Sequence, residues 1–166
     1  MKRLLSIVLC LAWALWLGGL MALFVFVQTL FARSRPLAVQ AAPVLFLAFE
    51  RYELIVGALA LVAAIGWRIR VRSRSLTLLL TLLVLAAVGA IVSSITITGP
   101  MEQLRAIGQS GSAEFKRLHG YSMMVYVTQT VLLVIAGVML PGILRSNTAT
   151  GVSQPPHQTR PETAPE

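Results

Sequence analysis

The stretch that decides the fold runs from Leu4 to Phe31 and reads LLSIVLCLAWALWLGGLMALFVFVQTLF. It carries no charged residue, and at about 1.5 Å per residue it would form a helix of roughly 40 Å, enough to cross a hydrocarbon core of about 30 Å. Lys2 and Arg3 precede it, as in a signal peptide, but an apolar segment of that kind is only about 7–15 residues long. We therefore expect a retained first transmembrane helix.

Three more apolar blocks follow the first one along the chain. Basic residues and prolines separate them, with boundaries expected at Pro36, Pro43 and the Gly99-Pro100 pair, and the Pro141-Gly142 pair is expected to end the last block. The pattern predicts an all-α membrane protein, a bundle of four transmembrane helices within a domain of residues 1–145. The expected spans are about 4–31, 44–67, 76–98 and 119–140.

The segment between the third and fourth blocks is mixed in character. Met101, Leu104 and Ile107 recur at helical spacing before Gly108 interrupts the pattern. This spacing predicts a short interfacial helix between spans three and four. Residues 146–166 are rich in Ser, Thr, Pro and Gln and predict a disordered polar tail.

Composition and charge exclude several classes of protein. The chain is 57% hydrophobic and only 12% charged, and its formal net charge is +8. The basic residues stand in short clusters between apolar blocks, which is typical of orientation charges and not of a nucleic-acid-binding face. The single cysteine, Cys10, cannot form an intrachain disulfide.

The distribution of basic residues predicts the orientation. The densest cluster, Arg68–Arg74, lies in the short second loop, on the same side as both termini of a four-span bundle. By the positive-inside rule this side faces the cytoplasm of a bacterium, and the protein lies in the inner membrane. The basic residues expected on the other side are Arg33, Arg35, Arg105, Lys116 and Arg117. Of these, Arg33 and Arg35 oppose the assignment.

Most of the ionisable residues that lie near the spans fall in the half of the bundle expected to face the periplasm. Glu50 and Glu53 are three residues apart on one helix face, which Gly57 continues, so we expect them to point inward. They form either an ion-pair clasp with Arg51, Arg105 or Arg117, or a ligand or ion site. The candidate polar cluster comprises Glu50, Arg51, Glu53, Glu102, Arg105, Arg117 and His119.

A polar stripe follows His119 along the fourth span. Ser122, Tyr126 and Gln129 continue its face at spacings of three, four and three residues. Gln129 is expected near mid-bilayer, where its amide needs a partner. Interhelical hydrogen bonding to span one or three explains such a stripe, with the uncharged polar run Ser93–Thr98 as a candidate partner. A polar pathway or head-group pocket is the alternative.

Cofactor chemistry receives little support. His119, Met123 and Met101 are weak candidates for a soft metal ion such as Cu(I). Haem is less favoured still, because the second histidine, His157, lies in the tail. The absence of any Asp removes a Ser-His-Asp triad, and no phosphate-binding glycine motif is present. We expect no catalytic residues, no resident cofactor and, on balance, no enzyme.

Three segments together resemble a known family. They are Trp16–Met21 leading into Phe24–Val27, Phe49–Tyr52, and Phe115–His119 followed by Ser122. In order and spacing they resemble the transmembrane protein 205-like family, whose bacterial members form a membrane domain of unknown function. The resemblance covers about residues 10–140 and implies a multi-span membrane protein, without a reaction or substrate.

These observations favour a membrane protein that binds or helps move a small ligand, ion or metal through its periplasm-facing polar cluster. The alternative is an accessory or structural subunit that packs against a larger membrane protein or against further copies of itself. A haem- or copper-linked redox protein is the third and least favoured interpretation. The lipid bilayer is the expected environment in each case, and no nucleic acid is expected as a partner.

Overall fold

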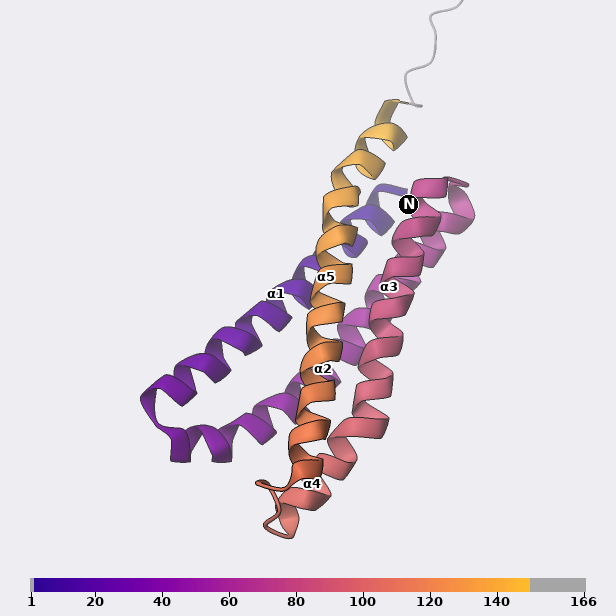
Figure 1. Ribbon diagram of the computed structural model, residues 1–166. Helices are drawn as coiled ribbons and strands as arrows, with labels where there is room; N and C mark the ends of the chain where they lie inside the picture. The colour runs from indigo at the N-terminus through magenta and orange to yellow at the C-terminus, as the bar shows by residue number, and fades with distance from the viewer. Residues whose placement is uncertain (1, 150–166) are drawn as a thin grey trace, which may run out of the picture.

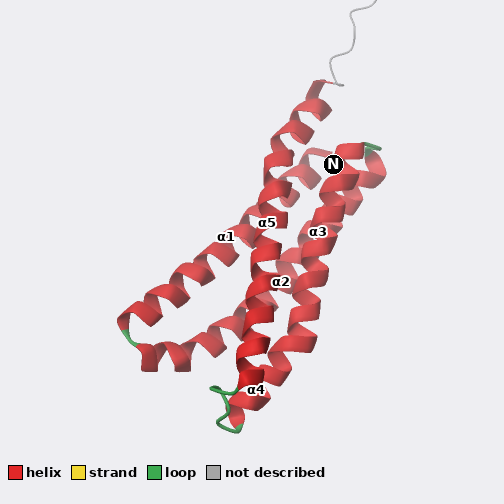
Figure 2. Cartoon of the chain, in the orientation of Figure 1, coloured by secondary structure: helices red, strands yellow, loops and turns green. Residues whose placement is uncertain are grey.

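The computed structural model describes residues 2–149, which fold into long helices joined by short connections (Figures 1 and 2). The connections are Ser34 alone, residues 71–73 and residues 107–112. The helices are α1 (Lys2–Arg33), α2 (Arg35–Arg70), α3 (Arg74–Ser93), a π-helical turn η1 (Ser94–Thr98), α4 (Gly99–Ala106) and α5 (Ala113–Ala149).

The helices form two antiparallel hairpins. In the first, α1 packs along α2, and in the second, α3 packs along α5. Contacts of α2 with α3 and of α1 with α5 join the hairpins. All four helices come together at the end that holds the start of α1 and the 71–73 loop, and the hairpins diverge toward Ser34 and the 107–112 loop (Figure 1). We call these the closed end and the open end.

Side chains at spacings of three and four residues build the core of the closed half. On α1, Leu9, Ala12 and Trp16 are fully buried, as expected for one face of a helix. Alanines on α2 and leucines on α3 and α5 meet them, so that small residues bring the helices close and large ones fill the space. The core therefore lies away from the open end.

Large apolar side chains also cover the outside of the bundle. Ile55, Ile69 and Val138 are 70%, 77% and 78% exposed. Three helical segments are long and apolar enough to cross a membrane: Arg3–Arg33, Arg74–Ala106 and Ala113–Arg145. An outward-facing apolar surface of this kind suits lipid and not water.

The structure corrects the helix ends expected at prolines. Pro43 lies inside α2 and Pro141 inside α5, so neither one ends a helix. An interior proline costs about 3 kcal/mol. A break in lipid would leave several backbone groups without partners, each costing several kcal/mol, so the helix continues.

The third span also continues past its predicted end at Gly99-Pro100. The turn η1 leads directly into α4 with helical backbone angles at Thr98 and Gly99, so Pro100 lies in the first turn of α4 without ending the helical segment. Residues Arg74–Ala106 thus form one apolar helical segment, and the separate interfacial helix expected after residue 101 is not seen. The helix α5 runs to Ala149, beyond the start of the predicted tail at residue 146, and residues 150–166 lie outside the described part.

Candidate functional site

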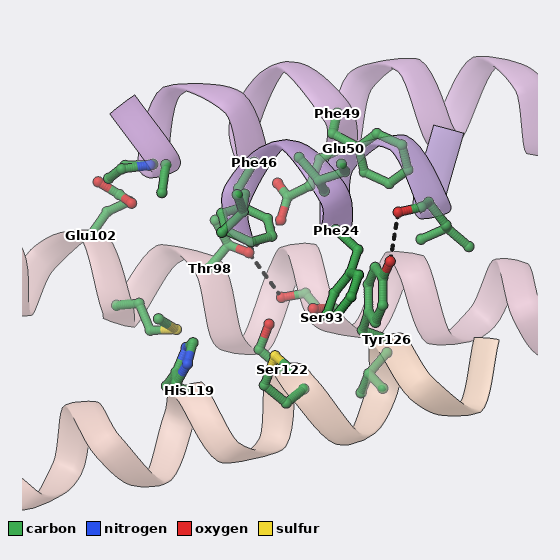
Figure 3. Close-up of a pocket in the computed structure, with 18 of the residues that line it drawn as sticks. Phe24, Phe46, Phe49, Glu50, Ser93, Thr98, Glu102, His119, Ser122 and Tyr126 are labelled. Carbon is green, nitrogen blue, oxygen red and sulfur yellow. Dashed lines mark hydrogen bonds between the residues drawn. The ribbon is translucent and has the colours of Figure 1, made fainter. Parts of the chain in front are cut away.

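A cavity of about 410 Å³ opens between the two hairpins at the open end. Figure 3 shows Phe46, Phe49 and Glu50 of α2 facing Ser122, Tyr126 and His119 of α5 across it. Its wall extends from the connection ends of the helices inward as far as Leu20 on α1, Glu53 on α2, Ala90 on α3 and Gln129 on α5. The cavity therefore reaches from the open end to the middle of the bundle.

Aromatic side chains dominate the wall. Five of the six phenylalanines in the chain line the cavity, and Tyr126 joins them. The rings of Phe24 and Tyr126 are stacked, with centroids 6.4 Å apart. The Tyr126 hydroxyl donates to the backbone oxygen of Leu20 at 2.5 Å and so links α5 to α1. The five phenylalanines are Phe24, Phe31, Phe46, Phe49 and Phe115.

Glu50 lies on the wall with hydroxyl partners. Ser94 donates to its Oε2 at 3.3 Å, and Thr98 donates to its Oε1. Both hydroxyls come from η1, and the continuation of the third helix past its expected end holds this turn against α2. Among the residues that the structure describes, no arginine or lysine pairs with Glu50.

Glu53 is the most buried charged side chain of the described bundle, at 6% exposure. Its Oε1 accepts two hydrogen bonds, from Trp16 Nε1 at 2.8 Å and from Gln129 Nε2 at 2.7 Å. Gln129 also donates to the backbone oxygen of Ala86 at 3.0 Å. This polar layer of Trp16, Glu53 and Gln129 joins α1, α2, α3 and α5 at the inner end of the cavity.

The arginines do not clasp the two glutamates as one interpretation of the sequence expected. Arg105 pairs with Glu102, its neighbour on α4, and lies 5.3 Å from the centre of the Phe115 ring. Both members of that pair line the outer part of the cavity. Arg51 and Arg117 are exposed and lie off the cavity wall.

The polar stripe of α5 lies on the cavity wall along its whole length. His119, Ser122, Tyr126 and Gln129 all line the cavity. The partners of Gln129 come from α2 and α3, and not from the Ser93–Thr98 run suggested by the sequence. Tyr126 and Gln129 thus bridge helices, while His119 and Ser122 lie on the wall and form no side-chain hydrogen bond or ion pair with any described residue.

The metal candidates share the same wall. His119, Met123 and Met101 all line the cavity. Within residues 2–149, no three side chains of the His, Cys, Asp and Glu types gather in a way that could hold a metal ion. A soft ion would depend on the one imidazole and the two thioethers.

Sequence reasoning did not identify the aromatic wall or the role of Trp16. Phe46 and Phe49 precede Glu50 and Glu53 by four residues each, so each ring shares a face with a carboxylate. That spacing could have predicted a helix face that carries both aromatic rings and carboxylates. No sequence pattern connects the indole N–H of Trp16 with Glu53.

Comparison with known proteins identified no relative of this chain. No family model matches the chain, and the searches of curated proteins and of solved structures found no match.

Proposed function

We propose that this chain is a four-span integral protein of a bacterial inner membrane that binds a small, largely apolar ligand in the cavity between its two hairpins. The observation that carries the proposal is the cavity itself, with its aromatic wall and its few polar groups at the inner end. Ligand sites in proteins are typically concave and mostly apolar, with a small number of polar groups that fix orientation. The sequence resemblance to the transmembrane protein 205-like family agrees with a multi-span membrane protein.

The fourth span of this proposal is α2. It has 36 residues and packs between α1 and α3, both of which are apolar enough to cross a membrane. Its two carboxylates, Glu50 and Glu53, point into the bundle and accept hydrogen bonds there. A helix that keeps its ionisable groups away from lipid meets the requirement for a span.

The orientation follows from the basic residues at the closed end. Arg68, Arg70, Arg72 and Arg74 surround the 71–73 connection. The positive-inside rule places this end in the cytoplasm. The cavity then opens toward the periplasm and the outer leaflet.

Filling the cavity tests the proposal. Ser122→Trp would place an indole into the cavity, whereas Thr128→Trp adds the same side chain at an exposed position on α5 off the cavity wall. Both variants and the wild type would be purified in mild detergent, and their bound small molecules identified by native mass spectrometry. We expect a bound species in the wild type and in Thr128→Trp that is absent from Ser122→Trp.

The same purification addresses the accessory-subunit alternative. A stoichiometric protein partner that stays bound to all three forms, with no small molecule in any of them, would refute the ligand-binding proposal. Equal ligand occupancy in Ser122→Trp and Thr128→Trp would place the ligand outside the cavity.

A further inference from the structure

The cavity wall is acidic within a basic protein. The chain as a whole has a net charge of +8. The charged groups on the wall are nevertheless Glu50, Glu53 and Glu102, with Arg105 as the one cation among the described lining residues. Because Arg105 pairs with Glu102, the two glutamates of α2 set the charge of the inner cavity.

Neither inner glutamate has a cationic partner among residues 2–149. Glu50 accepts hydrogen bonds from two hydroxyls, and Glu53 from an indole N–H and an amide N–H. All four donors are neutral. A carboxylate at membrane depth needs either a proton or a nearby cation to offset its desolvation.

One oxygen of Glu53 has no hydrogen-bond donor in the described part of the chain. Both donors reach Oε1, and no described residue donates to Oε2. No fully buried side-chain nitrogen or oxygen in the described part of the chain lacks a partner. Oε2 is therefore not sealed in the core, and Glu53 lines both the large cavity and a smaller one beside Trp16 and Gly57.

We propose that the ligand of this cavity is an organic monocation with an apolar body, its charge held by Glu53 and Glu50 and its body by the phenylalanine rings. This inference rests on the proposed function, since it names the ligand class for the same cavity. Aromatic faces attract cations and also bury apolar groups. An inorganic divalent ion fits less well, because it requires about six oxygen ligands and both oxygens of Glu50 already accept hydrogen bonds.

Comparing the affinity for a charged ligand with that for its uncharged carbon isostere separates the effect of charge on binding from the effect of shape. Benzyltrimethylammonium and neopentylbenzene differ in one atom, a cationic nitrogen in place of carbon. Each would be titrated into the full-length protein in lipid nanodiscs, with calorimetry or ligand-observed NMR as the readout, and with empty nanodiscs as the blank. We expect the cation to bind about tenfold or more tightly than the isostere, since only the cation gains from carboxylates and ring faces.

The glutamates are tested with isosteric variants. In Glu53→Gln the amide oxygen can still accept from Trp16 and Gln129, so the variant removes the charge and keeps both hydrogen bonds. Glu114→Gln is the matched control, because Glu114 is exposed at the start of α5 and lies off the cavity wall. We expect Glu53→Gln, and also Glu50→Gln, to lower cation affinity about tenfold and to leave affinity for the isostere unchanged.

The outcomes distinguish this inference from the proposed function. Equal affinity for the two probes, or unchanged cation affinity in both Glu53→Gln and Glu50→Gln, overturns the cationic ligand and leaves the cavity as a binding site for neutral molecules. Binding of neither probe, together with no bound small molecule in wild type or Thr128→Trp, overturns both. A melting temperature within a few degrees of wild type verifies that each glutamine variant is folded.

Discussion

The contact of Trp13 with Gly137 is predicted to hold the two hairpins together at the closed end. A Cβ atom added at Gly137 would lie 2.1 Å from Cζ2 of Trp13 and 2.8 Å from Cε2 and Cη2. The indole would have to retreat by roughly 1.3 Å to restore an ordinary contact of 3.4 Å. Such a movement breaks the 2.8 Å hydrogen bond from Trp13 Nε1 to the backbone oxygen of Leu133.

The size of the effect follows from three contributions. Overpacking costs about 1–3 kcal/mol, and loss of the hydrogen bond about 0.5–1.5 kcal/mol. Replacing a helical glycine by alanine stabilises the helix by at most about 1 kcal/mol, which offsets part of this cost. We therefore expect Gly137→Ala to destabilise the protein by about 2 kcal/mol.

The assay is thermal unfolding in detergent, followed by tryptophan fluorescence or by size-exclusion chromatography after heating. Gly120→Ala is the matched control on the same helix, because nothing lies within 4 Å of the added Cβ. A second comparison places Gly137→Ala in a Trp13→Leu background, where the clash is absent and the two substitutions should couple strongly. Equal melting temperatures of Gly137→Ala and Gly120→Ala, or additive effects in the double variant, would refute the predicted packing.

Two further predictions concern the inner core and the orientation. Gly57→Ala should destabilise the folded protein by about 1 kcal/mol, because the added Cβ would lie 3.1 Å from the fully buried, hydrogen-bonded indole of Trp16. In the control Gly18→Ala, the added Cβ meets nothing within 4 Å, so this variant should be as stable as the wild type or more stable. Alkaline phosphatase fused after Gly111 should be active and after Ser73 inactive, and the reverse pattern would place the cavity on the cytoplasmic side.

The helical class of this protein could be predicted from sequence because it depends on local properties. A long uncharged block such as Leu4–Phe31 is enough to indicate a helix that can span a membrane. Helix ends were less predictable, because prolines mark them reliably only where water can satisfy the freed backbone groups. Pro43 and Pro141 therefore misled the boundaries.

The two glutamates and the polar stripe of the site were predictable from sequence, whereas the aromatic wall and the hydrogen-bond pairings were not. The i,i+3 spacing of Glu50 and Glu53 and the stripe from His119 to Gln129 placed these residues on two faces that do line one cavity. Partner choice depends on the register between helices, which periodicity does not specify. Charge complementarity favoured arginines, whereas the packed helices present an indole, an amide and two hydroxyls.

The same register explains why the bundle is closed at one end and open at the other. In the closed half, Gly137 leaves room for the ring of Trp13, so α5 approaches α1 through direct apolar packing. Toward the open end, α5 presents Gln129 and Tyr126, which reach Glu53 and the backbone of Leu20 with long polar side chains. Buried hydrogen bonds of this kind are costly to break, so they help to fix how the helices lie relative to one another. Two members of the polar layer that joins the hairpins, Glu53 and Gln129, thus also line the inner end of the cavity, and a ligand bound against Glu53 would lie beside the hydrogen bonds that join α1, α2, α3 and α5.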